Sequence, residues 1–182
     1  MEEPGSRIYH EKQRLQFCLL HALNNLFQEA AFSRAELNGI AGRLVLDVPE
    51  KVAWTPLSAL FSSHHNAITG NYDINVLIAA IEGKGKTVVW HDRRNGSSSI
   101  PLHLPESRMM GILLNVPVKR IGGLWRSRHW VALRRLDNAW YNLDSDLSTP
   151  HKFNDCDGVR DFLEGIVAAG GEVLLVMNKP NC

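Results

Sequence analysis

Apolar residues recur at helical spacing through the first half of the chain. In three segments they fall three and four positions apart along one face, which predicts amphipathic helices at residues 18–27 and 33–44 and a third that starts near residue 72 and is ended by Gly83 or Gly85. Ser33 and Glu36 have the spacing of a capping box, in which two side chains satisfy the backbone where a helix begins. Residues 45–70 carry two prolines and no steady period, so we expect loops there with one or two short helices.

The pattern changes to strands in the second half. Apolar and alternating residues predict strands at residues 86–92, 110–116, 129–136 and 139–145, then a helix at 155–171 and a strand at 172–178. Asp137 and Asn138 separate two alternating strands, which is typical of an antiparallel hairpin with a two-residue turn. Helices that precede an antiparallel sheet indicate an α+β fold rather than repeated strand–helix–strand units.

Composition and charge exclude several classes of protein. The 182 residues, 45% hydrophobic and 21% charged, fit one globular domain over residues 1–182. The formal net charge of +1 gives no overall attraction to nucleic acid or to an anionic membrane. Basic residues do gather between residues 119 and 135. Because no nucleic-acid motif accompanies them, we interpret them as the solvated rim of a strand pair.

Targeting signals and cysteine usage point to the same setting. The longest apolar run, residues 109–116, is far shorter than the roughly 20 residues that cross a bilayer, so we expect no transmembrane segment. The polar start of the chain lacks the features of a signal peptide. The three cysteines include no CxxC pair, so we expect no disulfide framework and a reducing compartment, the cytoplasm or the nucleus.

The position of Cys18 raises a chemical question. It stands at the start of the first predicted helix, where unpaired N–H groups and the helix dipole favour a thiolate, the nucleophilic form of cysteine. A lone cysteine is also commonly a small apolar core residue. Cys156 is a weaker candidate, because the carboxylates of Asp155 and Asp157 flank it and oppose a thiolate.

A nucleophilic cysteine needs a base, and the base needs a group that orients it. His129 opens a predicted strand, and the hairpin partner of that strand carries Asp144. The two-residue turn places Leu136 opposite Ala139, and the same register brings Asp144 close to His129 across the ladder. The carboxylate would then fix the imidazole tautomer. A purely structural hydrogen bond between two strands is the alternative.

Acyl transfer also requires donors for the developing oxyanion. Gln13 lies shortly before the first predicted helix, so its side-chain NH₂ and the backbone N–H of Cys18 can converge on one point. Alone, Gln13 would be interpreted as a solvated loop residue. Together with Cys18, His129 and Asp144 it predicts a thiol protease. Neither a zinc-finger spacing nor a phosphate-binding loop is present, so we expect no metal and no cofactor.

Four stretches of the sequence resemble the Josephin family of cysteine deubiquitinases. They are residues 9–28, 70–86, 126–145 and 170–176. The resemblance covers nearly the whole chain and implies a papain-like α+β cysteine protease fold. By motif position it implies that Cys18 is the nucleophile and His129 the general base and acid. It also implies that Gln13 is the oxyanion-hole donor and that Asp144 takes the orienting position, where some members have asparagine.

The resemblance also implies a substrate. The family cleaves the bond after the C-terminal glycine pair of ubiquitin, so we expect ubiquitin and ubiquitinated proteins as partners of a monomeric enzyme. Ile74 is the candidate contact for the apolar patch of ubiquitin. Trp125 and Trp130 are candidate walls for the groove that takes its tail, with core aromatics as the alternative. A tryptophan that some members carry just after this helix is replaced here by Lys84.

Two other functions fit the same residues. One is a ubiquitin-binding module with little turnover, which would need no aligned thiol. The other is the same chemistry on a different ubiquitin-like modifier. Reaction of Cys18 with electrophilic probes built on several modifiers separates these functions from deubiquitination.

Overall fold

We describe the fold from a computed structural model. The structure describes residues 8–13, 17–46, 65–66, 71–72, 74–120 and 125–179. Its helices are α1 (Cys18–Phe27), α2 (Arg34–Leu46), α3 (Ile74–Gly83) and α4 (Cys156–Ala168). Its main strands are β3 (Lys86–Trp90), β4 (Met109–Arg120), β5 (Trp125–Leu136), β6 (Ala139–Asn142), β7 (His151–Lys152) and β8 (Glu172–Asn178). Two further strands, β1 (His65–Asn66) and β2 (Asn71–Tyr72), pair with each other.

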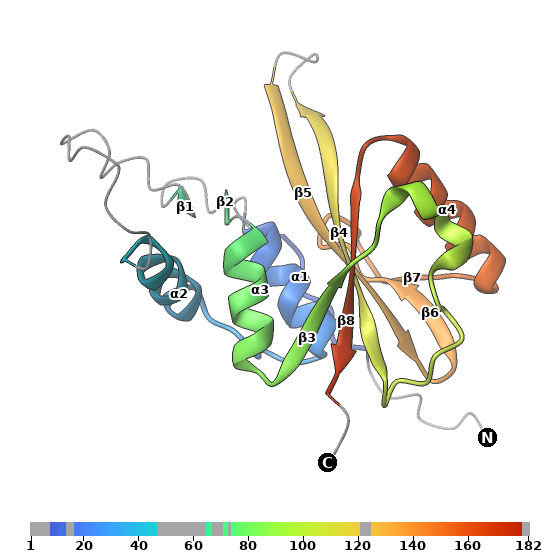
Figure 1. The fold of residues 1–182 in the computed structure, drawn as a ribbon, viewed down its shortest axis with the longest axis horizontal. Helices are drawn as coiled ribbons and strands as arrows, with labels where there is room; N and C mark the ends of the chain where they lie inside the picture. Colours follow the sequence, from blue (N-terminus) through green and yellow to red (C-terminus); the bar gives the residue numbers. More distant parts are fainter. Residues whose placement is uncertain are drawn as a thin grey trace.

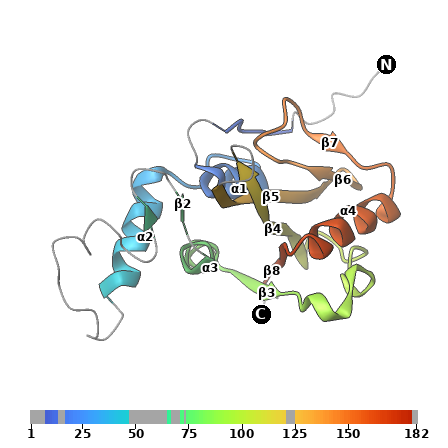
Figure 2. The same cartoon turned by 90° about the horizontal axis from the view of Figure 1, so that it is seen from above.

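One antiparallel sheet forms the middle layer of the molecule (Figure 1). Its strand order is β3-β8-β4-β5-β6-β7, so β8 lies between strands that come long before it in the chain. Helices α1 and α3 lie on one side of this sheet and α4 on the other, as the view from above shows (Figure 2). The predicted α+β class is confirmed.

Successive side chains of the central strands enter two different hydrophobic cores. Leu113 and Leu174 pack with the apolar residues of α1 and α3. Their neighbours Ile112, Leu114 and Leu175 pack with those of α4. This alternation is the period of two that a strand imposes, and both of its faces are apolar because helices cover both sides of the sheet.

The first two predicted helices are confirmed. Helix α1 has the predicted bounds of 18–27, and α2 begins one residue after Ser33. The backbone N–H of Ser33 donates to a carboxylate oxygen of Glu36 at 2.7 Å, and the N–H of Glu36 donates to Oγ of Ser33 at 3.3 Å. The capping box therefore forms as its spacing indicates.

The predicted hairpin register is also confirmed. Leu136 lies opposite Ala139, and Asp137 and Asn138 have φ values of 48° and 65°. Positive φ at both central positions is what a type I′ turn requires, and asparagine and aspartate adopt it more readily than most residues. The turn thus fixes which residues of β5 and β6 face each other.

Several strand bounds differ from the sequence prediction. Strands β4 and β5 are longer than the predicted 110–116 and 129–136, because their pairing continues to Arg120 opposite Trp125, through a polar segment without alternation. Strand β6 ends at Asn142 rather than at 145, where the Asn142 side chain accepts from the N–H of Asp144 at 3.0 Å. The short helices predicted in 45–70 lie largely outside the described residues, and 65–66 is a strand.

Helix α1 is seated closely on β4 and β5. A Cβ at Gly111 would lie 2.5 Å from the carbonyl oxygen of Leu133 and 2.6 Å from Cδ1 of Leu26, so only glycine allows this approach. Arg134 of β5 donates to the carbonyl of Leu26 in the last turn of α1. These contacts fix the C-terminal end of the helix on the strand that also carries His129.

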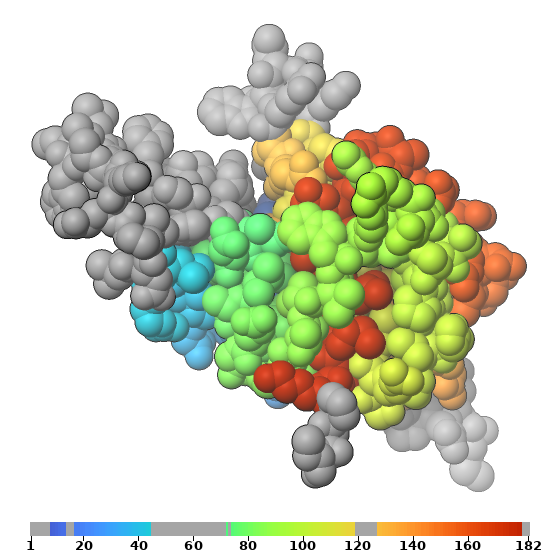
Figure 3. Space-filling view, in the orientation of Figure 1, coloured from blue at the N-terminus to red at the C-terminus, as the bar shows by residue number. Residues whose placement is uncertain are grey.

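Helix α2 packs on α3 and stands farther from the sheet than α1 does (Figure 1). On the face shown in Figure 3, β3 forms the surface beside α3, and its Val89 and Trp90 are largely exposed. In the part of the chain that the structure describes, every helix is too short or too polar to span a bilayer.

Candidate active site

Cys18 is the first residue of α1 and is 5% exposed. The preceding residue, Phe17, supplies no side-chain hydrogen bond to the helix start, and the first turn contains no acidic residue. The leading N–H groups of a helix carry a partial positive charge and stabilise a nearby anion. The surroundings of Cys18 therefore suit a thiolate, although its burial alone would equally suit a core cysteine.

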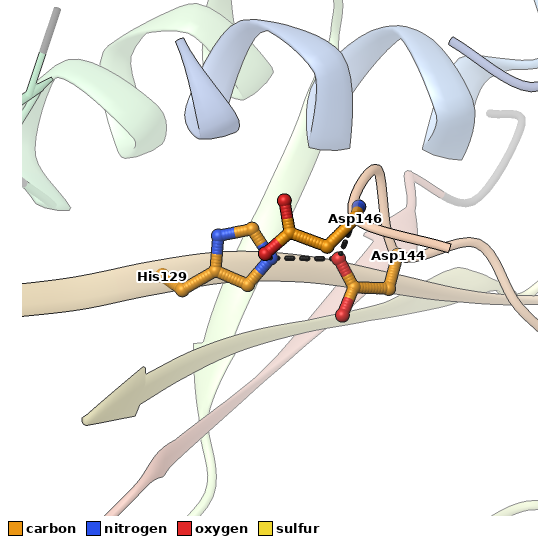
Figure 4. A group of neighbouring side chains, drawn as sticks. All are labelled: His129, Asp144 and Asp146. Carbon is orange, nitrogen blue, oxygen red and sulfur yellow. Dashed lines mark hydrogen bonds and ion pairs between the residues drawn. The ribbon is translucent and has the colours of Figure 1, made fainter. Parts of the chain in front are cut away.

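His129 and Asp144 meet as the sequence predicts. Nε2 of His129 lies 2.6 Å from Oδ1 of Asp144, and the His129 side chain is only 6% exposed. Asp144 is not in the ladder itself but in the loop directly after β6. The bond between its N–H and the Asn142 side chain starts that loop. Figure 4 shows the carboxylate on the Nε2 side of the ring, with α1 passing over the imidazole.

The second ring nitrogen of His129 is left for Cys18. Nδ1 is buried and has no hydrogen-bond partner within the described residues. Burial lowers the pKa of His129, but the hydrogen bond to Asp144 and the adjacent Cys18 outweigh it and raise the pKa to about 10. Cys18 is thus close enough to interact with the imidazole, and long or poorly aligned contacts of this kind are common in catalytic pairs without substrate.

Asp146 is a second carboxylate at the same imidazole, which the sequence did not indicate. Its Oδ2 lies 3.6 Å from Nε2 of His129, and its N–H donates to Oδ1 of Asp144 at 2.9 Å. Its side chain is 54% exposed, so this second carboxylate is in contact with solvent. The loop after β6 therefore surrounds Nε2 with negative charge, which stabilises an imidazolium.

The side chains of His129, Asp144 and Asp146 together offer a nitrogen and two carboxylate oxygens within 4.8 Å of one another. Nε2 of His129 is already hydrogen-bonded to Asp144. We therefore interpret the group as an imidazolium with two carboxylate neighbours.

Gln13 is tied to the same loop from the N-terminal side. Its N–H donates to the carbonyl of Ser145 at 2.8 Å, and its Oε1 accepts from the Ser145 hydroxyl at 3.3 Å. With Oε1 taken by this hydroxyl, the NH₂ group of the amide is the end left to donate elsewhere. His10 also reaches this loop, with Nε2 2.9 Å from the carbonyl oxygen of Asp144.

The three residues predicted to contact ubiquitin occupy different surroundings. Ile74 is the first residue of α3 and is half-buried against the core that contains α1. Trp130 is 3% exposed and belongs to that core, so it matches the core-aromatic alternative and offers a partner almost no surface. The side chain of Trp125 lies outside the described residues.

Comparison with known proteins gives one consistent result. The Josephin family matches residues 13–177. A Josephin-like protein of Arabidopsis thaliana is 61% identical over 165 residues, which are 90% of this chain and 46% of that protein. Josephin-2 of Homo sapiens is 42% identical over an alignment of 189 positions that covers 98% of this chain and 93% of that protein. Ataxin-3 of Homo sapiens is 28% identical over an alignment of 180 positions that covers 96% of this chain and 47% of that protein.

Proposed function

The chain belongs to the Josephin family, and from this premise we propose that it is a deubiquitinating thiol protease with Cys18 as its nucleophile. One observation carries the proposal. A cysteine at an uncapped helix start stands beside an imidazole whose far nitrogen is bonded to a carboxylate at 2.6 Å. A core cysteine has no need of a base, and a buried histidine has no need of a free Nδ1 that faces a thiol.

The proposed reaction uses the two nitrogens of His129 differently. Nδ1 of the imidazolium holds the proton that Cys18 has given up, and the thiolate attacks the carbonyl carbon of the last glycine of ubiquitin. As the bond from this carbon to the lysine nitrogen breaks, Nδ1 gives its proton to the departing amine. The neutral Nδ1 then deprotonates a water molecule, which attacks the thioester, releases ubiquitin as its C-terminal acid and returns Cys18 to its starting state. Throughout, Nε2 stays bonded to Asp144, which keeps the ring oriented and stabilises its charged form.

Gln13 and the backbone of Cys18 are the proposed oxyanion donors. Negative charge on the glycine oxygen develops next to the attacked carbon, at the N-terminal end of α1. The N–H of Cys18 is there already, and the NH₂ group of Gln13 is the free end of an amide held by Ser145. Loss of one such donor costs roughly 100- to 1,000-fold in kcat in other acyl-transfer enzymes.

The partner in this proposal is ubiquitin on a modified protein, acted on by a monomer. Ile74 at the start of α3 is the proposed contact for the apolar patch of ubiquitin, because it is half-buried and keeps apolar surface available. We place the enzyme in the cytoplasm or the nucleus, since its three cysteines include no CxxC pair and both Cys18 and Cys156 are free thiols, which fits a reducing compartment.

A ubiquitin that carries an electrophile at its C-terminus tests the proposal directly. The purified chain is incubated with this probe beside Cys18→Ala, His129→Ala and, as a matched control, Cys156→Ala. We expect one covalent adduct on Cys18 in the unmodified chain and in Cys156→Ala. The adduct should be absent from Cys18→Ala and form slowly in His129→Ala.

Each other outcome contradicts part of the proposal. A folded chain that binds ubiquitin and forms no adduct is a binding module with little turnover. An adduct with a probe built on another ubiquitin-like modifier, in the absence of one with ubiquitin, assigns the chemistry to that modifier. An adduct that persists in Cys18→Ala removes Cys18 from the mechanism.

A further inference from the structure

Asn25 of α1 uses its whole side-chain amide on segments outside its own helix. Its Oδ1 accepts from the N–H of Glu11 at 2.5 Å, and its Nδ2 donates to the carbonyl of Glu11 at 3.1 Å. The same Nδ2 donates to the carbonyl of Leu143 at 2.9 Å. Asn25 is 0% exposed, so these bonds form where no water competes for them.

The two segments that Asn25 binds each lead into the site. Glu11 stands two residues before Gln13, and Leu143 directly precedes Asp144. Asn25 itself follows Cys18 by seven residues, which is two helical turns and therefore the same face of α1. One amide thus connects the helix of the proposed nucleophile to the segments of the proposed oxyanion donor and of the orienting carboxylate.

The two segments are also bonded to each other. The N–H of Gln13 donates to the carbonyl of Ser145 at 2.8 Å, and His10 bonds to the carbonyl of Asp144 at 2.9 Å. The helix, the N-terminal segment and the loop after β6 therefore form a closed triangle of hydrogen bonds. We call this triangle the three-segment joint, and Asn25 is the residue in it that touches both other segments from α1.

We propose that Asn25 is a positioning residue that sets Gln13 and Asp144 relative to Cys18, an inference that rests on the proposed thiol protease function. A buried amide with three bonds tolerates little displacement, because each broken bond leaves an unsatisfied polar group. The carbonyls of Glu11 and Leu143 therefore stay at fixed distances from α1. Gln13 lies two residues after Glu11 and Asp144 directly follows Leu143, so both side chains are held in place relative to α1 as well.

Asn24 supplies a matched control on the same helix. It is the same residue type, it is 2% exposed, and it also uses both ends of its amide. Its Oδ1 accepts from the N–H of Phe32 at 2.9 Å and its Nδ2 donates to the carbonyl of Phe32 at 3.1 Å. A further bond reaches the Glu11 carboxylate at 3.1 Å. None of these bonds involves the backbone of the two segments that carry Gln13 and Asp144.

The experiment compares Asn25→Ala with Asn24→Ala in the full chain. Three quantities are measured: resistance to denaturant, kcat and KM for ubiquitin that carries a C-terminal fluorophore, and the downfield proton resonance of the His129 Nε2–H. We expect both variants to lose stability to a similar extent. Only Asn25→Ala should lose kcat, by about 10- to 100-fold with KM little changed, because a displacement of about 1 Å is enough for such a loss.

The proton resonance separates this inference from the proposed function. If the unmodified chain does not cleave ubiquitin, the resonance still reports the His129–Asp144 bond. It should move upfield or broaden in Asn25→Ala and stay in place in Asn24→Ala. An equal loss of kcat in both variants, or a resonance that Asn25→Ala leaves unchanged, would overturn the inference.

A second variant covers the case in which Asn25→Ala does not fold. Asn25→Ser keeps a neutral hydroxyl that can accept from a backbone N–H but is too short to bridge two segments, so it releases Leu143 without burying a charge. We expect the same loss of kcat and the same shift of the resonance. Native values of both in this variant would also overturn the inference.

Discussion

Two of the helices that the structure describes begin with a cysteine, and only one of these thiols has the surroundings of a nucleophile. Cys156 at the start of α4 is exposed, Asp155 before it caps the helix by accepting from the N–H of Gly158 at 2.8 Å, and Asp157 adds a second carboxylate to the first turn. Cys18 at the start of α1 is buried, with no side-chain cap from Phe17 and no acid in its first turn.

The difference shows what a helix N-terminus can and cannot do for a thiol. At α4 the caps already occupy the positive end of the helix, so little of its field remains for a thiolate. At α1 no cap or acid reduces that field, and His129 adds a base beside it. The residue type and the helix position are the same, so the chemistry comes from the groups that surround the helix start.

Replacement of each cysteine by alanine tests most directly which of the two thiols activity depends on. Cys18→Ala should abolish cleavage of a ubiquitin fluorophore, a loss of at least about 10⁴-fold, because no other group can form the acyl-enzyme. Cys156→Ala should retain activity close to that of the unmodified chain. Measurement of kcat/KM for both variants gives the answer. Activity that is lost in Cys156→Ala and kept in Cys18→Ala would make Cys156, not Cys18, the nucleophile.

Loss of the Asp144 charge should have the next largest effect on kcat. This carboxylate, bonded to His129, distinguishes the surroundings of Cys18 from those of Cys156. Asp144→Asn keeps the size of the side chain and removes its charge. We expect kcat to fall by about 10- to 100-fold, the equivalent of one charge-assisted hydrogen bond. Steady-state kinetics at neutral pH give this value. An unchanged kcat would make the His129–Asp144 bond structural only.

The pH dependence sharpens the same test. The pKa of His129 is raised to about 10, so the imidazolium persists far above the ordinary histidine range, and activity should fall only as the pH passes about 10. Asp144→Asn removes a cause of the increase, so this alkaline limb should move to lower pH. By linkage, the imidazolium stabilises the fold below pH about 6.5, and this contribution is lost as the pH rises through about 10. An alkaline limb at the same pH in both proteins would contradict the assignment.

A methyl group added under α1 and one added on α4 should change the free energy of unfolding in opposite directions, because only the first meets close contacts. Gly111→Ala inserts a methyl group against Leu133 and Leu26 under α1 and should destabilise the fold by about 1–3 kcal/mol. Gly165→Ala, in α4, meets nothing within 4 Å and should stabilise it by up to about 1 kcal/mol. Denaturant unfolding of both variants measures these changes. Equal effects would mean that α1 is not closely seated.

The smallest expected effect concerns the cap of α4. Asp155→Ala removes the acceptor for the N–H of Gly158 and should cost about 1 kcal/mol of the free energy of unfolding. The rate at which Cys18 reacts with the ubiquitin probe should stay the same, because α4 lies on the other side of the sheet. A change in that rate would show that the two helix ends are coupled.

Local patterns made much of the fold and part of the site predictable. The bounds of α1, the capping box of α2 and the hairpin register follow from residues within a few positions of one another. The contact between Asp144 and His129 was predicted from the same register. It does form, but through the loop after β6 rather than through paired strands. Helix bounds and hairpin register could be predicted because hydrophobic period and turn residues act over a few neighbouring positions.

The rest of the site depends on bonds between distant segments, which leave no periodic trace. Asn25 looks like any other polar residue of an amphipathic helix, and its bond to Leu143 spans 118 positions of sequence. His10 and Asp146 lie in polar stretches where no pattern in the sequence marks them as part of the site. Trp130 shows the converse, since its position beside His129 in the sequence suggested a groove wall and the fold buries it in the core.

The position of β8 has a consequence for the order in which the sheet is completed. Among the elements that the structure describes, this strand is the last in chain order, yet it lies between β3 and β4 in the sheet. Until residues 172–178 have been synthesised, β3 is not joined to β4, and the core that contains Cys18 lacks Leu174 and Val176. The core around the proposed nucleophile is therefore completed only by long-range strand pairing, which is slow to form.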